Sequence, residues 1–331
     1  MAILRLLSAK DLERVLQMKD VIEVVDRGYR LFSDGQAGVF PILSKEFEHE
    51  RNEMDIKAGH LAGAGLYGLK IIGWAADNPE KRGLPALAGL VVVMDIETQQ
   101  PVGLVEARTV TRLRTGAAGA VGARELSRED SKSVLVVGLG DQGEAQVDAL
   151  LCVRPGIERV VACGRSPEKS KSYVEKMRER HPAVIFESAG LDQRASAAGE
   201  SDIIITCTPS HKPLIEKAWV RPGTHISAIG ADMPGKQELD IELMASSRIV
   251  ADSRDQVLKQ GESQAAFALG RVSAEDIDEI GEILLGRKPS RLSGKEVTVF
   301  DATGMAIQDI LTAELALSRA RRENIGTSVE I

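Results

Sequence analysis

The chain has 331 residues, 43% of them hydrophobic and 27% charged, which is ordinary for a folded globular protein. Its formal net charge of −7 argues against nucleic acid or an anionic membrane as a general partner. No run approaches the length of a membrane span, the N-terminus has no signal-peptide pattern, and the three cysteines lie far apart, so we expect a cytoplasmic protein with reduced thiols.

The first third of the chain predicts a mixed α+β unit. Ser8 is placed to cap a short helix that begins at Ala9, and a longer helix is predicted over 18–35. Lys57 lies on the charged face of the first expected strand, and a loop is predicted over 77–85. The expected strands are 53–58, 68–74, 87–94 and 102–106.

A glycine motif follows a predicted helix that begins at Thr111 and an apolar strand. In this Gly-x-Gly-x-x-Gly pattern, Gly138 permits a tight turn, Gly140 lets the backbone approach a pyrophosphate, and Gly143 allows close helix packing. A helix is predicted directly afterwards, over 144–151. The order is typical of a dinucleotide-binding site; the alternative is a glycine-rich turn that binds nothing.

Strands and helices alternate through the remainder of the chain. This alternation predicts a parallel, doubly wound sheet of the Rossmann type. A final helix over 306–322 places Ile307, Ile310, Leu311 and Leu315 on one face, so we expect it to dock. The expected strands are 159–163, 183–187, 202–207, 225–229, 248–251 and 297–300.

The end of the second strand of this fold usually distinguishes NAD from NADP. An acid there binds the adenosine ribose, but this chain has Arg165 and Ser166 and no acid at the tip. An arginine and a hydroxyl suit a ribose phosphate, which favours NADP over NAD. The alternative is that Arg165 is a solvated loop residue and either cofactor binds.

Two cations are candidates for substrate binding. Lys70 is a single lysine in an apolar strand; in an enclosed cleft its pKa would fall, and its amine would hold a carboxylate or exchange a proton. The alternative is a lysine that extends its amine to solvent. Arg114 and Thr115 lie near the start of the predicted helix, where they and the helix amides are expected to bind a cofactor phosphate or a substrate carboxylate.

Residues after two later strands are candidates for the reacting end of the cofactor. Asp232 follows the strand at 225–229, at the sheet edge where ligands of open α/β folds bind, and is a candidate proton carrier. Its alternative role is to cap a turn. Cys207 and Thr208 end another strand at the same edge and are expected to line the nicotinamide. The histidines have no metal-ligand spacing, so no metal site is predicted.

Taken together, these motifs resemble the ornithine cyclodeaminase/mu-crystallin family, and within it the archaeal-type alanine dehydrogenases. The resemblance extends over nearly the whole chain, with the motifs in the family's order. The stretches that carry it are 78–79, 83–85, 114–118, 138–143, 206–210, 223–232, 234–240 and 300–304.

The resemblance implies a homodimer of two-domain chains. Residues 1–115 together with 305–331 would form an α+β substrate-binding and dimerisation domain, and 116–304 a Rossmann dinucleotide-binding domain. Lys70 matches the family's active-site lysine, Arg114 its arginine near substrate and cofactor, and Asp232 its catalytic carboxylate. Family members often carry a further cation in the first strands, and none stands at the corresponding positions 40–42 of this chain; Lys57 is the predicted replacement.

The same resemblance extends the set of expected cofactor contacts. Their shared feature is a position at the ends of the Rossmann strands or in the helix before them. They are Arg114, Thr115, Gly138, Gly140, Asp141, Gln142, Gly143, Arg165, Ser166, Cys207, Thr208, Pro209, Ile229, Gly230, Ala231 and Thr303.

Three activities are compatible with these residues. The first is NAD(P)-dependent oxidation of a small amino acid, or the reverse reduction of its imino or keto acid, and this is the activity we favour. The second is an ornithine-type cyclodeamination in which the nicotinamide is recycled without net turnover. The third is binding of a small ligand, as in the mu-crystallins.

Overall fold

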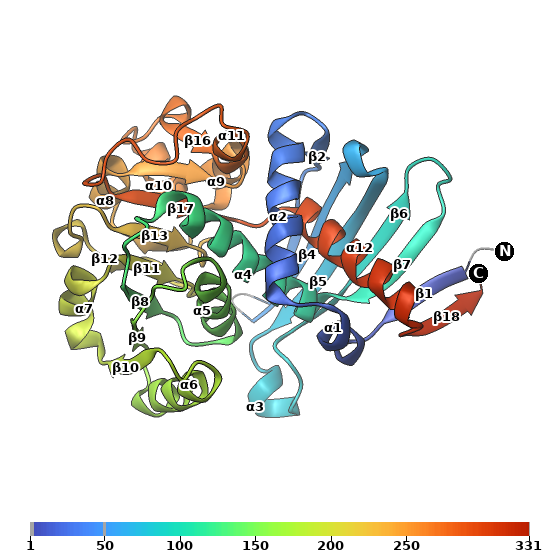
Figure 1. Ribbon diagram of the computed structural model, residues 1–331, viewed down its shortest axis with the longest axis horizontal. Coiled ribbons are helices and arrows are strands. Elements are labelled where there is room, and N and C mark those ends of the chain that lie inside the picture. The colour runs from blue at the N-terminus through green and yellow to red at the C-terminus, as the bar shows by residue number, and fades with distance from the viewer. Residues whose placement is uncertain (1–2, 49–50, 331) are drawn as a thin grey trace. The chain divides into compact units, whose positions relative to one another are not determined.

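The computed structural model describes residues 3–48 and 51–330, which form two compact units (Figure 1). The first unit comprises Met1–Arg114 and Met305–Ile331, and the second Thr115–Gly304. Within the described ranges, no helix combines the length and the apolar composition needed to cross a membrane.

The first unit is built on an eight-stranded, mainly antiparallel sheet with the order β18-β1-β7-β6-β5-β4-β2, and β3 pairs with β4. Its strands are β1 (Ile3–Leu7), β2 (Ala37–Val39), β3 (Leu43–Glu48), β4 (Asn52–Leu61), β5 (Leu66–Ala75), β6 (Leu87–Asp95), β7 (Pro101–Glu106) and β18 (Thr327–Glu330). Its helices are α1 (Ala9–Val15), α2 (Met18–Ser33), α3 (Asn78–Arg82), the first part of α4 (Ala107–Leu126), and α12 (Ala306–Glu323). The predicted α+β character of this unit is confirmed.

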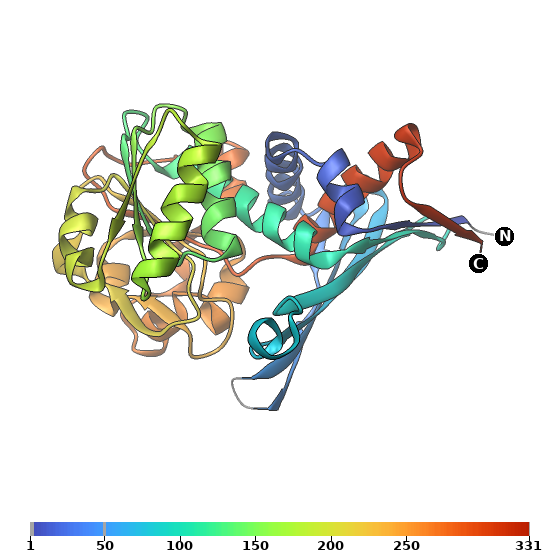
Figure 2. The same ribbon diagram turned by 90° about the horizontal axis from the view of Figure 1, so that it is seen from below.

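Helices α1, α2 and α12 lie on one face of this sheet (Figure 2). The predicted cap of α1 is confirmed, because the Ser8 hydroxyl accepts a hydrogen bond from the Asp11 amide. The predicted docking of the C-terminal helix is also confirmed: α12 packs on α2 and on strands β4 to β7, and Ile307, Ile310 and Leu311 are buried. This burial places Gln308, Asp309 and Thr312 of α12 inside the unit.

Two predictions for this region were wrong. The stretch predicted as a loop contains the short helix α3, which has a proline in its first turn and ends at Gly83 with φ +63°. Helix α4 begins at Ala107, four residues before the predicted start, because the Glu106 carboxylate accepts the amides of Arg108 and Thr109. Arg114 is therefore inside the helix, and the amides of the helix start are not beside it.

The second unit contains the predicted parallel, doubly wound sheet, with the strand order β10-β9-β8-β11-β13-β17-β15-β16. Its strands are β8 (Ser133–Val137), β9 (Arg159–Cys163), β10 (Ile185–Ala189), β11 (Ile203–Thr206), β13 (His225–Ala228), β15 (Arg248–Ala251), β16 (Ile277–Glu279), β17 (Thr298–Asp301), and a separate pair, β12 (His211–Ile215) with β14 (Gln237–Leu239). Its helices are α5 (Asp141–Val153), α6 (Pro167–Arg180), α7 (Arg194–Glu200), α8 (Ile241–Ser246), α9 (Arg254–Gln260), α10 (Gln264–Ala268) and α11 (Ile280–Leu284).

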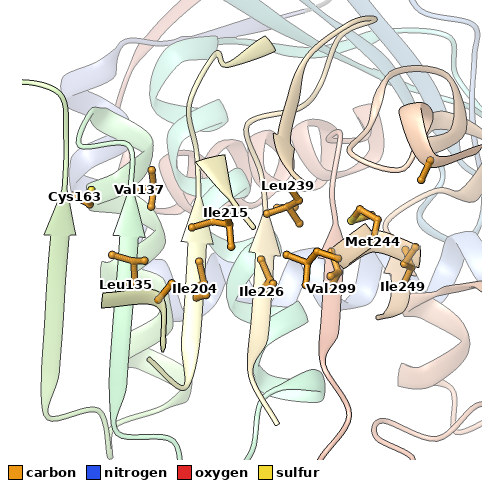
Figure 3. Packing of buried hydrophobic residues seen from close by; sticks show 14 of the residues in the cluster. Leu135, Val137, Cys163, Ile204, Ile215, Ile226, Leu239, Met244, Ile249 and Val299 are labelled. Atoms are coloured by element: carbon orange, nitrogen blue, oxygen red, sulfur yellow. The ribbon is translucent and has the colours of Figure 1, made fainter. Parts of the chain in front are cut away.

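The core of the second unit explains its parallel sheet. Strands β8, β11, β13 and β17 are almost entirely buried, so apolar side chains are favoured on both of their faces. Figure 3 shows Leu135, Ile204, Ile226 and Val299 packing side by side from neighbouring strands. The loops that follow these strands are thereby fixed at one edge of a rigid sheet.

Candidate functional site

The glycine motif connects β8 to α5, and each glycine meets a different steric requirement. Gly138 has φ +108°, and a Cβ there would lie 2.6 Å from the Cys207 carbonyl oxygen. A Cβ on Gly143 would lie 2.1 Å from the Gly138 carbonyl oxygen, whereas a Cβ on Gly140 would meet no atom within 4 Å. Close packing at two glycines and open space at the middle one fit the approach of a pyrophosphate.

The start of α5 supplies the donors that such a pyrophosphate needs. Gly140 is the N-cap and has no side chain to bond the first amides, and Asp141 and Gln142 open the helix. Thr115 contributes its carbonyl oxygen to a 2.8 Å hydrogen bond from the Gln146 side chain, which ties α4 to α5. These residues fit the predicted phosphate end of a dinucleotide.

At the end of β9, Ser166 and Arg165 have different environments. The Ser166 hydroxyl caps α6, accepting the Lys169 amide at 3.2 Å and donating to Glu168 at 2.8 Å. Arg165 is exposed. Of the two residues predicted to recognise a ribose phosphate, Arg165 is therefore the one with an accessible charged group.

The loops after β11 and β13 are joined by a buried acid that the sequence did not reveal. Glu238 accepts the Thr208 amide and hydroxyl, both at 2.7 Å, and the Gly230 amide at 2.9 Å. The Cys207 thiol lies 3.2 Å from the Gly138 carbonyl oxygen, so the first loop also contacts the glycine motif. The structure thus brings these loops, with Pro209, Ile229 and Ala231, to the same sheet edge as the motif.

Two further predicted residues follow strands of this sheet. Thr303 is buried after β17, and its hydroxyl lies 3.4 Å from an Asp252 carboxylate oxygen. Asp232 follows β13, and its side chain is 43% exposed. Its carboxylate forms a 2.7 Å ion pair with Lys236, which sequence reasoning missed. A carboxylate at this edge of the sheet is a candidate proton acceptor.

In the first unit, the structure brings together Lys57, Lys70 and Arg114. Lys57 and Lys70 are direct partners across β4 and β5, and Arg114 extends from α4. All three are at most 5% exposed. The fully buried carboxylate of Asp309 accepts Lys70 Nζ at 3.0 Å and Arg114 Nε at 2.9 Å through the same oxygen, Oδ1. We refer to Lys57, Lys70, Arg114 and Asp309 as the cation cluster.

Burial and charge together make Lys70 unusual. Burial and, less strongly, the neighbouring charges of Arg114 and Lys57 lower the pKa of Lys70 to about 7, although Asp309 opposes this shift. For Asp309, burial raises the pKa, but Arg114 and Lys70 outweigh this effect and hold it below its ordinary value. One carboxylate thus faces three cationic side chains. Such a cluster attracts an anion, and Lys70 is poised to exchange a proton near neutral pH.

Gln308 and Asp309 are residues of this site that sequence reasoning missed. The side-chain oxygen of Gln308 accepts a hydrogen bond from Arg114 Nη1 at 3.1 Å, and the side-chain nitrogen of Gln308 donates one to the Tyr29 hydroxyl at 2.6 Å. Gln308 therefore orients the guanidinium of Arg114. A signal existed in the sequence. The first turns of the final helix are rich in apolar residues, and a polar pair inside such a segment is expected to need buried partners.

The chain as a whole is similar to proteins of one known family. The model of the ornithine cyclodeaminase/mu-crystallin family matches residues 4–324. The alanine dehydrogenase of Archaeoglobus fulgidus is 36% identical over 326 residues, which cover 98% of each chain.

Two solved structures are similar over almost the entire length of the chain. An archaeal alanine dehydrogenase dimer with bound NAD has a TM-score of 0.92 and 34% identity, with all of both chains covered. The Thermococcus litoralis Δ1-pyrroline-2-carboxylate reductase in complex with NADH and L-proline has a TM-score of 0.93 and 31% identity, covering 98% of this chain and 100% of that one. The chain belongs to the ornithine cyclodeaminase/mu-crystallin family.

Proposed function

We propose that the protein is an NAD(P)-dependent oxidoreductase that interconverts a small amino acid and its imino or keto acid. The observation that carries the proposal is the buried cation cluster, in which Lys70 has a pKa of about 7. It combines a site for a carboxylate with a group that exchanges protons at neutral pH. The relatives support the same class, since one is an alanine dehydrogenase and another is a reductase of a cyclic imino acid.

The first unit is proposed to bind the substrate. Arg114 and Lys70 would hold its carboxylate, with Lys57 adding positive charge in place of the cation that is missing from the first strands. During oxidation, neutral Lys70 would accept a proton from the substrate nitrogen, and during reduction its protonated form would return it. Asp232, in the second unit, is proposed as a further proton carrier. The hydride acceptor or donor for the substrate's α carbon would be supplied by the nicotinamide.

The second unit is proposed to hold the dinucleotide. Gly138, Gly140 and Gly143, with the start of α5, would bind the pyrophosphate. Thr208 and Gly230, fixed by Glu238, would hold the nicotinamide end. The other proposed contacts are Arg114, Thr115, Asp141, Gln142, Arg165, Ser166, Cys207, Pro209, Ile229, Ala231 and Thr303.

The choice of cofactor is proposed to favour NADP because of Arg165. Its exposed guanidinium is available to a ribose phosphate, and β9 ends without an acid that would bind a free ribose hydroxyl. Arg165→Ala is expected to raise the KM for NADPH about tenfold while changing that for NADH less than about twofold. Steady-state kinetics with both cofactors measure this, and a wild-type preference for NADH would contradict it.

An absorbance screen tests the proposed activity against its alternatives. Small amino acids, and keto or imino acids with ammonia, would be incubated with each nicotinamide. Net oxidation or reduction of the nicotinamide is the expected result. Release of ammonia from a diamino acid without net nicotinamide turnover would instead identify a cyclodeaminase, and ligand binding without turnover would identify a binding protein.

Asp232→Ala tests the proposed role of this carboxylate. Removing a proton acceptor is expected to lower kcat about a hundredfold while KM for the nicotinamide changes little. Lys236→Ala is the companion variant: it removes the ion pair but keeps the acid, so it should cost less than Asp232→Ala. Near-normal turnover of the Asp232→Ala variant would remove the assignment.

A homodimer is proposed to form through the outer face of the first sheet. Leu43, Ile56, Ile71 and Leu90 are paired in one row across β3, β4, β5 and β6. Leu43, Ile71 and Leu90 are 58%, 37% and 47% exposed. Such a row of exposed apolar side chains is typical of an interface, and the related archaeal alanine dehydrogenase structure is described as a dimer.

Leu90→Asp is expected to weaken this dimer at least about a hundredfold, because a carboxylate would be buried among apolar side chains. Sedimentation velocity over a range of concentrations measures the effect. Leu292→Asp is the control, since Leu292 is 71% exposed and belongs to the second unit. A wild-type chain that sediments as a monomer at micromolar concentrations would contradict the proposal.

A further inference from the structure

Three carboxylates are buried together in the second unit. Glu238, Glu262 and Asp301 are each at most 1% exposed. Throughout the described residues, 3–48 and 51–330, the hydrogen-bond partners of these carboxylates are amides and hydroxyls, and no lysine, arginine or histidine forms an ion pair with them. We refer to these three residues as the carboxylate chain.

The carboxylate chain links the end of β17 to β14. Asp301 accepts the amides of Glu262 and Ser263 at 3.0 and 2.8 Å, and the Ser263 hydroxyl at 2.7 Å. The Glu262 carboxylate in turn accepts the Glu238 amide at 2.9 Å and the Leu239 amide at 2.6 Å. Each acid therefore positions the backbone that carries the next acid.

Within the carboxylate chain, Glu238 is the residue that contacts the loops proposed to hold the nicotinamide. It binds the Thr208 amide after β11 and the Gly230 amide after β13. The contact is so close that a Cβ on Gly230 would lie 2.6 Å from Glu238 Oε2 and 2.3 Å from the Thr208 carbonyl oxygen. The carboxylate thus lies directly against both loops.

Buried negative charge without a paired cation is energetically unfavourable, and the pKa values of the three acids are raised accordingly. Burial raises the pKa of Glu238 and of Asp301 to about 7, and burial together with the neighbouring acids raises that of Glu262 well above its ordinary value. A positive charge brought to the same loops would lower this cost. The oxidised nicotinamide ring carries one positive charge and the reduced ring carries none, so only the oxidised form supplies it.

We propose that the carboxylate chain, acting through Glu238, makes the protein bind the oxidised nicotinamide more tightly relative to the reduced form than the loops alone would. The proposal rests on the proposed function, since it requires that the second unit bind a nicotinamide dinucleotide. Glu238 is here a positioning residue with an added electrostatic effect. A purely structural brace would affect both redox forms equally, because it acts only on the shape of the loops.

Calorimetric titration in the absence of substrate tests this proposal. The dissociation constants of NAD+ and NADH, or of NADP+ and NADPH, would be measured at pH 8, where Glu238 of the free protein is mostly ionised. In Glu238→Gln, the ratio of the oxidised to the reduced constant is expected to rise about tenfold. In Asp301→Asn, which removes the more distant acid whose pKa is also about 7, the rise should be about threefold.

Two control variants separate charge from shape. Glu238→Asp keeps the charge but shortens the side chain, so both dissociation constants should increase together and their ratio should stay within about twofold of the wild-type ratio. Glu216→Gln removes an exposed acid from the same unit and should leave both constants unchanged, because solvent screens that charge. Circular dichroism checks that each variant is folded.

The outcomes distinguish the two proposals. If the wild-type chain binds neither redox form, the proposed function fails. If it binds both, but the ratio is unchanged in Glu238→Gln, or in Asp301→Asn should Glu238→Gln not fold, the electrostatic proposal fails while the proposed function stands. The proposal is supported if the ratio rises in Glu238→Gln and Asp301→Asn but not in Glu238→Asp or Glu216→Gln.

Discussion

Lys70→Ala is expected to lower kcat/KM for the amino or imino acid at least about a thousandfold. Lys70 is proposed both to bind the substrate carboxylate and to exchange a proton near pH 7. Because Lys70 is buried, we expect no exposed side chain to take over either role in the variant. The affinity for the nicotinamide should stay within about twofold, because the glycine motif belongs to the second unit. Steady-state kinetics and calorimetry measure the two effects separately.

The pH profile of the wild-type protein provides a second readout of Lys70. With a pKa of about 7, the amine is protonated below this pH and neutral above it. Amino acid oxidation needs the neutral form as acceptor, so its kcat/KM should rise through pH 7, whereas that of imine reduction should fall. In Lys70→Ala, this change of kcat/KM through pH 7 should disappear. The control is Lys19→Ala, which removes an exposed lysine; wild-type activity in Lys70→Ala would contradict the assignment.

Asp309→Asn is expected to lower the free energy of unfolding by about 3 to 5 kcal/mol at pH 6. The substitution leaves Lys57, Lys70 and Arg114 buried without the carboxylate that now pairs with two of them. Part of the loss should be recovered at pH 8, because Lys70 relieves the repulsion when it loses its proton. Urea denaturation at both pH values measures the effect.

Thr312→Val is the matched control for Asp309→Asn. Thr312 lies one turn later on α12, and its buried hydroxyl has no hydrogen-bond partner among the described residues. Its replacement by valine should change stability by less than about 1 kcal/mol. Equal stability of Asp309→Asn and the wild type at pH 6 would contradict the electrostatic account of the cation cluster.

Folded Asp309→Asn should also have a shifted pH profile. The change of kcat/KM that follows the titration of Lys70 should move to lower pH, because Asp309 raises the pKa of Lys70.

The parts of the fold that the sequence predicted are those with strong local patterns. Continuous apolar runs predicted β8, β9, β10, β11, β13, β15 and β17 of the parallel sheet, and the serine cap predicted the start of α1. The strands that were not predicted are β1, β2, β3, β12, β14, β16 and β18. Among them, β3 and β18 are exposed edge strands without an apolar period, and pairing with a neighbour creates them. Strand β10 begins two residues later than predicted because a turn, with a bond from the Val184 amide to the His181 carbonyl oxygen, precedes it.

The candidate site was predictable to the extent that it consists of local motifs. The glycine motif and the single lysine in an apolar strand stand out from their neighbours. Asp309 is distant in sequence from Lys70 and Arg114, and Glu238 is distant from Thr208, so only the tertiary structure reveals these pairs. Both acids sit in otherwise buried segments, where a charged residue implies a partner without identifying it.

Transfer of deuterium from the substrate's α carbon tests the proposed function most directly. Alanine, proline, aspartate and ornithine, each deuterated at the α carbon, would be incubated with NAD+ and with NADP+, and the nicotinamide analysed by mass spectrometry. The account predicts that at least one amino acid is consumed and that reduced nicotinamide accumulates with an equimolar amount of deuterium. Consumption that leaves the deuterium in the product without reduced nicotinamide, or no consumption of any substrate, would contradict it.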